Sequence, residues 1–256
     1  MQIITAPSKT QAFNGRDFAD HTLPSGLAKT ERIIARLKGL NFSELGKLMK
    51  TSDKLTEATR RRIAQFSLPF SLANARQALF TFQGDAYSAI CSDSYSAAQL
   101  HHAQRHLVIL SGLYGSLRPL DLMQPYRLEM GCRLSVDGAS DLCHFWRDEV
   151  TSAMNEAFCN DGDKTLINLA SAEYARVIDR KALQPKFINI TFKQPHKKGG
   201  YRTIPIHSKR ARGAMIHFMI TGAIDIAEGL LEFNLGGYRF NRKESTEDEW
   251  IFLQDQ

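Results

Sequence analysis

The stretch from Leu110 to Gly131, LSGLYGSLRPLDLMQPYRLEMG, mixes large apolar side chains with many hydrogen-bonding ones. Gly112 and Gly115 permit positive φ or a close approach of two backbones. Ser116 is a suitable N-cap for a following helix, and Pro119 would be tolerated in the first turn of that helix. A helix, a glycine turn and a second helix form a helix-hairpin-helix, whose free backbone amides can meet a phosphate. The stretch predicts such a motif, although two residues separate the glycines where one is typical.

Positive charge is concentrated in two other segments of the chain. The formal net charge is +6, and residues 193–213 contain seven lysines and arginines without an acidic residue. Residues 54–76 contain five basic residues and only Glu57. Basic runs are solvated faces as often as binding surfaces, so the charge alone permits a polyanionic partner without requiring one.

Two histidines have the spacing of a metal-binding pair. His102 and His106 lie four residues apart on a predicted helix, but no third ligand accompanies them at a suitable spacing. We therefore expect solvent-facing or capping histidines and predict no metal site. The four cysteines, which are scattered and form no CxxC pair, are predicted to be reduced thiols: Cys91, Cys132, Cys143 and Cys159.

Polar residues also gather where predicted strands end. In α/β folds such positions often form small-molecule sites, and the alternative is a set of turn and cap hydrogen bonds. The residues concerned are Gln83, Asp85, Tyr87, Asn168, Ser171, Glu173 and Tyr174.

These residues must be positioned by alternating helices and strands. Apolar periodicity and cap residues predict strands at 2–5, 76–82, 165–170, 186–192 and 201–207. The same signals predict helices at 25–40, 97–110, 141–159 and 209–220, and two more within 41–66, begun by Ser43 and Ser52. The predicted fold is therefore α+β (mixed α/β). It is a single compact domain over residues 1–256 with a mixed sheet, surrounding helices and the helix-hairpin-helix-like segment at about 98–130.

Several motifs together resemble the YaaA family of peroxide stress resistance proteins, formerly a domain of unknown function. Besides 110–131, the resemblance rests on APSKT (6–10), LMKTSDKL (48–55), ANARQALFTFQGDAY (73–87), INLASAEY (167–174), SKRARGAM (208–215) and EFNLGGYRF (232–240), which occur in the family's order. The resemblance implies a bacterial protein of the hydrogen peroxide response that limits unincorporated iron and protects DNA. It also implies a basic cleft that binds double-stranded DNA with little sequence preference.

The resemblance implies roles for individual residues in nucleic-acid binding. Ser111, Gly112 and Gly115 would form the hairpin, and Lys9 and Lys54 would line the cleft. The remaining implied contacts are the arginines beside the hairpin and the cluster at one helix start, namely Arg118, Arg127, Lys209, Arg210 and Arg212. For Arg118 and Arg127 the alternative is an ion pair with Asp121 or Glu129 inside the fold.

Three functional classes stay open at this level. Besides a DNA-binding protective protein, the same residues suit an enzyme acting on a nucleotide or another phosphorylated small molecule, so a small-molecule ligand is possible. Direct iron binding is the weakest alternative. The chain has no P-loop, nucleophile elbow, dinucleotide fingerprint or HExxH, so no reaction and no cofactor is predicted. The chain also lacks a signal peptide and a long apolar run, which predicts a cytoplasmic protein without a membrane partner.

Overall fold

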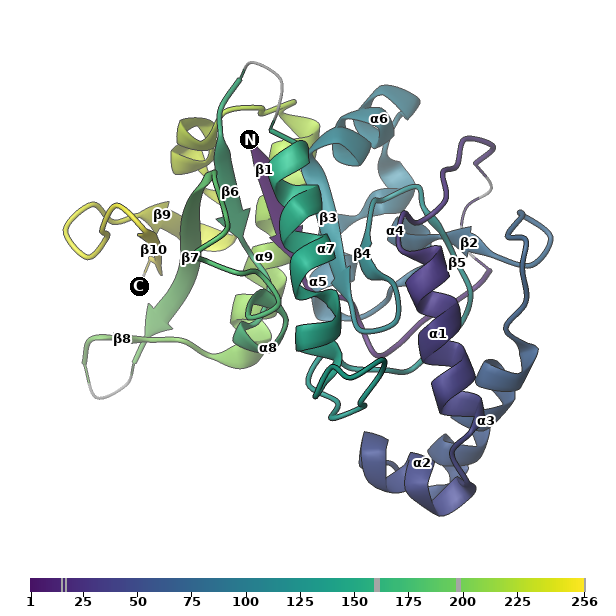
Figure 1. Cartoon of the computed structure of the whole chain (residues 1–256). Helices are drawn as coiled ribbons and strands as arrows, with labels where there is room; N and C mark the ends of the chain where they lie inside the picture. The colour runs from purple at the N-terminus through teal and green to yellow at the C-terminus, as the bar shows by residue number, and fades with distance from the viewer. Residues whose placement is uncertain (15, 17, 159–161, 197–198, 256) are drawn as a thin grey trace.

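A mixed sheet with helices on both faces organises the chain (Figure 1). The computed structural model describes residues 1–14, 16, 18–158, 162–196 and 199–255. The central strands run parallel and are β1 (Gln2–Thr5), β3 (Leu107–Ser111), β6 (Thr165–Asn168), β7 (Lys186–Pro195) and β10 (Glu249–Gln254). β1, β3 and β6 are buried along their whole length, as is typical of parallel strands covered by helices on both faces.

Antiparallel strands complete the sheet at its margins. β4 (Gly115–Leu117) pairs with β3, β9 (Tyr238–Phe240) pairs with β10, and β8 (Tyr201–Arg202) pairs with the end of β7. The order across the sheet is β4-β3-β1-β6-β7-β10-β9. A separate two-stranded sheet joins β2 (Arg76–Gln77) to β5 (Leu122–Met123). The sheet is therefore mixed, as predicted.

Helices connect the strands and cover the sheet. In Figure 1, α7 lies in front of the sheet and α9 behind it, while α1, α2 and α3 extend to the side. The α-helices are α1 (Leu27–Lys38), α2 (Phe42–Met49), α3 (Asp53–Gln65), α4 (Ala78–Thr81), α5 (Asp85–Ile90), α6 (Ala97–His106), α7 (Leu142–Glu156), α8 (Ala172–Ala175) and α9 (Pro205–Thr221). Short 3-10 turns occupy Ser92–Ser94, Ala227–Glu232 and Leu235–Gly237.

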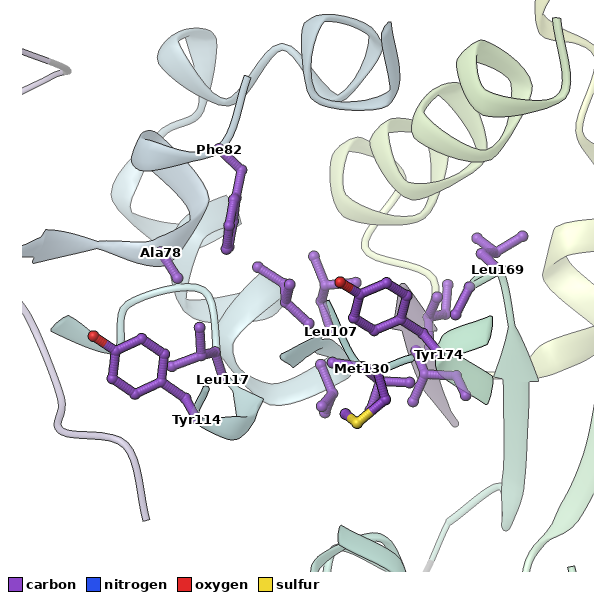
Figure 2. Close-up of a cluster of buried hydrophobic side chains, with 14 of the residues drawn as sticks. Ala78, Phe82, Leu107, Tyr114, Leu117, Met130, Leu169 and Tyr174 are labelled. Carbon is purple, nitrogen blue, oxygen red and sulfur yellow. The ribbon is translucent and has the colours of Figure 1, made fainter. Parts of the chain in front are cut away.

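The core follows the apolar pattern of these elements. Ile3 and Ile4 of β1 are fully buried, and Trp146 of α7 is completely enclosed. The Trp146 indole N–H donates to the Gly112 carbonyl oxygen at 3.0 Å, so its one polar group is satisfied in the interior. Figure 2 shows part of this core, with apolar side chains extending from Phe82 to Tyr174.

The predicted helix-hairpin-helix is wrong. Only the first helix is present, as α6, and the chain from Leu107 to Ser111 is the buried strand β3. Gly112 to Tyr114 form a tight turn into β4, and the segment from Ser116 to Met130 contains strands β4 and β5 but no helix. The apolar run LVIL is the reason: β-branched residues buried on both faces favour a central parallel strand over the end of a helix.

Three smaller predictions are also corrected. Residues 76–82 form the two-residue β2 followed by α4, and 201–207 contain β8 and then the first turn of α9. Pro205 explains the second case, because proline suits the first helical turn and lacks the N–H that a strand needs. Helix α2 begins after Asn41, whose side chain accepts a hydrogen bond from the Glu44 N–H in a capping box, and not at Ser43.

Candidate functional site

The order of the parallel strands creates a preferred place for a ligand. The five parallel strands lie across the sheet in the order β3, β1, β6, β7 and β10. Numbered by their position in the chain, this order is 2-1-3-4-5. The direction of chain progress therefore reverses between β1 and β6, and the loops at their carboxyl ends diverge to leave a crevice. A cavity of about 490 Å³ opens at this point.

Four segments supply the walls of this cavity, which we call the switch cavity. The loop after β1, the turn before α5, the start of α8 and the middle of α9 meet here. The lining residues are Thr5, Ala6, Pro7, Ser8, Lys9, Thr10, Gln83, Gly84, Asp85, Ala86, Tyr87, Leu169, Ser171, Glu173, Tyr174, Lys209 and Arg212. Segments separated by up to about two hundred residues therefore contribute to a single pocket whose size suits a small molecule.

A close helix contact sets the position of α9 over the cavity. A Cβ atom on Gly213 would lie 2.0 Å from the Ala86 carbonyl oxygen of α5, so only glycine permits this approach. Gly84, with φ +103°, turns the chain into α5 immediately before Asp85. These two glycines bring α9 and α5 together, so that Lys209 and Arg212 line the same cavity as Asp85.

Lys9 belongs to an ion cluster at one end of the switch cavity. Its Nζ lies 3.1 Å from Glu129 Oε1, and Arg127 Nη2 lies 3.6 Å from the same oxygen. The Lys9 side chain is 65% exposed, whereas those of Arg127 and Glu129 are 19% and 14% exposed. Arg127 therefore forms an ion pair inside the fold, which was the alternative to phosphate binding, while Lys9 extends toward solvent.

Arg212 is the unusual residue of the switch cavity. Its Nε is buried without a hydrogen-bond partner, and no ion pair joins it to any residue that the structure describes. Burial lowers the pKa of its guanidinium below the ordinary arginine value. Because guanidinium stays protonated even so, Arg212 is a desolvated positive charge facing a cavity.

A second cavity adjoins the first across an ion pair. Arg210 Nε lies 3.2 Å from Asp85 Oδ1, and Asp85 lines both spaces. The second cavity, of about 500 Å³, lies on the other side of α9 and is also lined by His207, Leu235 and Tyr238. Asp85 is thus paired with Arg210, and neither Lys209 nor Arg212 has an ion pair in the described part of the chain; Glu173 is the other carboxylate of the cavity lining.

The structure brings together only some of the predicted nucleic-acid contacts. Lys9, Lys209 and Arg212 line the switch cavity, and Arg210 borders it through Asp85. Arg118 lies elsewhere: it follows the antiparallel strand β4 and lines a separate space with Gln2, at the amino end of β1. Lys54, in the first turn of α3, is not among the lining residues.

The predicted hairpin residues are interior and bonded among themselves. Ser111 Oγ accepts hydrogen bonds from the N–H groups of Leu113 and Tyr114 at 3.2 and 3.1 Å, and it lies 2.8 Å from the Tyr126 hydroxyl. A Cβ on Gly112 would be 2.4 Å from the Leu128 carbonyl oxygen. Ser111, Gly112 and Gly115 therefore belong to a polar core, and their turn is buried away from an outside phosphate.

Most of the strand-end polar residues line the switch cavity. Gln83, Asp85, Tyr87, Ser171, Glu173 and Tyr174 all do so, while Asn168 instead donates from its side chain to Asn189 within the sheet. Thr5, Ser8 and Thr10 were missed at the sequence level. The signal was available, because Thr5 ends the first buried strand and APSKT directly follows it.

The histidine pair is held by the backbone. His102 is buried, so the expectation of a solvent-facing side chain is wrong for it; its Nε2 lies 3.2 Å from the Ile224 carbonyl oxygen. His106 Nδ1 lies 2.8 Å from the Met1 carbonyl oxygen. Burial lowers the pKa of both imidazoles. Among the described residues no group of three or more His, Cys, Asp or Glu side chains could hold a metal ion.

The cysteines of the described chain are free thiols. Cys91 is exposed, and Cys132 and Cys143 are buried; Cys159 lies outside the described residues, as do Lys197 and Lys198 of the basic run. Burial raises the pKa of Cys132 to about 11. No helix in the described ranges has the length and apolar character needed to cross a membrane.

Comparison with known proteins assigns the chain to a family. Residues 1–244 match the family model described as peroxide stress protein YaaA. The UPF0246 protein of Acaryochloris marina is 44% identical over 255 residues, covering 100% of both chains. The UPF0246 protein of Desulfotalea psychrophila is 44% identical over 252 residues, covering 98% of this chain and 97% of its own. The chain therefore belongs to the YaaA family of peroxide stress proteins.

Proposed function

We propose that this protein protects DNA during peroxide stress by binding the phosphate backbone of the duplex at the mouth of the switch cavity. The observation that carries the proposal is the convergence of exposed cations from distant segments, Lys9 from the loop after β1 and Lys209 and Arg210 from α9. We call these three residues the basic rim. Lys209 has no ion pair among the described residues, whereas Lys9 and Arg210 each have one carboxylate partner, Glu129 and Asp85. Exposed cations gathered at the mouth of one cavity favour a polyanionic ligand.

The chemistry of the rim favours weak sequence preference. Its members are two lysines and an arginine that already shares its guanidinium with Asp85. Phosphate contacts of this type position a duplex but carry no base information. Helix-hairpin-helix recognition is not part of the proposal, because the glycine turn lies in the core.

Duplex affinity measured across a range of salt concentrations tests the proposal. Fluorescence anisotropy with two unrelated duplexes should give similar affinities that fall steeply as salt rises. Lys9→Ala and Lys209→Ala should each weaken binding to both duplexes and reduce the logarithmic salt slope by about one unit, because each removes one phosphate contact.

Arg118→Ala is the matched control, because Arg118 is exposed and equally charged but lines a separate space with Gln2, at the amino end of β1. Its affinity and slope should equal those of the unmodified protein. Absence of binding at low salt, or equal losses in Arg118→Ala and Lys209→Ala, would contradict a site at the rim.

The link to iron is the part of the proposal that depends on family resemblance. We propose that limiting unincorporated iron and binding DNA are parts of one protective role. A deletion strain carrying the Lys9→Ala/Lys209→Ala variant should then resist peroxide less well than one carrying Arg118→Ala, and electron paramagnetic resonance of whole cells would report its free iron. If the rim variant showed the peroxide resistance and the free iron level of the wild type, the basic rim would have no part in either activity.

A further inference from the structure

We infer that the switch cavity is a binding site for a small phosphomonoester that also carries hydroxyl groups, such as a sugar phosphate, with Arg212 as its phosphate anchor. This site shares Lys209 with the basic rim, but it is distinct from the DNA proposal, because the phosphate would be held inside the cavity by Arg212 and not at the rim. Three observations, from topology, charge and wall chemistry, support it.

The first observation is the position of the cavity in the sheet. It lies at the carboxyl ends of β1 and β6, where the order of the parallel strands reverses. Open α/β sheets bind ligands in the crevice at such a reversal, because neighbouring loops there are drawn to opposite faces. The volume, about 490 Å³, is in the range of small-molecule pockets and is too small for a duplex.

The second observation is the charge on the cavity wall. Arg212 has a buried Nε without a partner, although it stands on the stable helix α9 among residues packed against α5. Desolvating an unpaired guanidinium costs folding free energy, so an anion bound in the cavity would offset that cost at Arg212. Lys209, one turn earlier on α9, has no ion pair among the described residues and lines the same cavity. A forked guanidinium beside an ammonium group suits a phosphoryl group.

The third observation is that the rest of the wall is polar and includes carboxylates. Glu173 accepts the Gly131 N–H at Oε1, at 3.0 Å, and Asp85 receives Arg210 at Oδ1. Among the described residues, no hydrogen bond or ion pair involves the second oxygen of either carboxylate, and both Glu173 and Asp85 line the cavity. Free carboxylate oxygens accept hydrogen bonds from hydroxyl groups, so they match the polyol part of the ligand and would repel a second phosphoryl group.

Calorimetry with inorganic phosphate and ribose 5-phosphate, at constant ionic strength, tests the site. Both should bind with a saturable one-to-one stoichiometry, and ribose 5-phosphate should bind more tightly. In Arg212→Gln the affinity for both should fall by roughly ten- to a hundredfold, which corresponds to the loss of charge-assisted hydrogen bonds. In Glu173→Gln the advantage of ribose 5-phosphate over inorganic phosphate should shrink.

Arg147→Gln is the matched control, because Arg147 also has a buried Nε without a partner but does not line the cavity. It should bind both probes like the unmodified protein. Equal losses in Arg147→Gln and Arg212→Gln, or unchanged phosphate binding in Arg212→Gln, would overturn the assignment.

Thermal melting of Arg212→Met separates an anchor from a structural residue. Methionine fills similar space without a buried charge, so the melting temperature without ligand should rise while stabilisation by phosphate is lost. A lower melting temperature with phosphate stabilisation retained would mean that Arg212 serves the fold alone and would overturn the proposal.

Duplex binding distinguishes this site from the basic rim. Arg212→Gln should bind duplexes with unchanged affinity, and Lys9→Ala should lose duplex affinity while keeping its affinity for inorganic phosphate. Parallel loss of both ligands in Arg212→Gln would mean that the cavity receives a phosphate of DNA, and the small-molecule site would be abandoned.

Discussion

At the scale of single residues, the polar side chains of Leu110–Gly131 act inside the fold. The Tyr114 hydroxyl donates to the Gln124 carbonyl oxygen and accepts the Gln124 N–H, while Asp121 accepts the Arg118 N–H at 2.7 Å. Burial raises the pKa of Asp121, which its hydrogen bonds partly oppose. These bonds satisfy buried groups that would otherwise destabilise the fold, so the dense polar chemistry of the stretch organises the core.

Cysteine reactivity gives a prediction at this scale. A thiol with a pKa near 11 is almost entirely protonated at neutral pH, so buried Cys132 should react slowly with peroxide or maleimide. Exposed Cys91 should react first. Mass spectrometry of peptides from the folded protein would show the order, and Cys91→Ser should leave Cys132 and Cys143 unmodified over the same time. Faster labelling of Cys132 than of Cys91 would contradict the burial.

The histidine pair predicts how stability depends on pH. The folded state lowers the pKa of His102 and His106 below the ordinary value of about 6.5, so the unfolded chain binds more protons in that window. The stabilisation by the two neutral imidazoles is therefore complete above about pH 6.5 and is lost as the pH falls toward their folded pKa values.

Urea unfolding at several pH values measures this effect. His102→Asn/His106→Asn should be less stable at neutral pH and should show a flatter acid limb. The exposed His21→Asn serves as control and should follow the unmodified protein. A double variant with an unchanged acid limb would show that other groups titrate there.

At the scale of elements, close approaches at glycine decide the geometry of the site. Gly213 allows α9 to lie against α5, and Gly115, with φ +72°, lets the β3–β4 turn lie against Trp146. The first contact orients the cationic face of α9, and the second holds the polar core. Neither contact follows from helix or strand propensity.

Gly213→Ala tests the helix contact. Alanine gains about 1 kcal/mol of intrinsic helix propensity, but its Cβ would overlap the Ala86 carbonyl oxygen, and overpacking costs about 1–3 kcal/mol. We expect a net loss of stability in urea unfolding and weaker phosphate binding, because α9 must move. Gly39→Ala is the control, since its nearest contact would be an ordinary 3.5 Å. A more stable Gly213→Ala variant would show that α5 yields without strain.

Gly115→Val tests the turn. A β-branched residue resists positive φ, and its Cβ would lie 2.5 Å from Trp146 Cε3. The strain and the overlap together should cost about 3 kcal/mol or more. The remaining folded fraction should bind duplexes normally, because the turn is buried. Lost duplex binding in a variant of normal stability would restore the turn as a contact surface.

At the scale of the whole molecule, the N-terminal strand joins the two halves of the sheet. β1 pairs with β3 on one side and with β6 on the other, so residues near position 4 connect segments near 108 and 168. The core therefore needs the first strand and the last third of the chain together. Only this arrangement brings Lys9 near Lys209 and Arg212.

Calorimetric unfolding tests whether the two halves of the sheet unfold together. A single transition, with calorimetric and van't Hoff enthalpies in agreement, is expected because β1 cannot keep one half folded without the other. Replacing fully buried Ile4 by alanine should lower the midpoint by weakening both halves at once, at a cost of about 2–5 kcal/mol. Two resolved transitions, of which Ile4→Ala shifts one, would indicate two domains.

The sequence alone determined much of the molecule. Apolar residues at helical spacing located α1 and α7, the cap residue Ser52 located α3, and an apolar run after a basic turn located most of α9. Buried apolar runs located β1, β6 and β7, because these local patterns hold in any tertiary arrangement. The specific motifs identified the family. The polar residues at strand ends were also visible as a set.

Tertiary structure decided the rest. LVIL became a strand and not a helix end because it is covered on both faces, and burial on both faces is a property of the assembled sheet. Arg127 and Arg118 looked equivalent beside the glycine turn. Arg127 pairs with Glu129 in the Lys9–Glu129 cluster, whereas Arg118 lines a separate space at the amino end of β1. Arg212 lacks an ion pair because the assembled fold brings no acidic side chain of the described residues into contact with it. The sequence shows only the neighbours of Arg212 along the chain. The order of the strands and the contacts between helices determine which distant residues meet, and therefore which residues line the switch cavity.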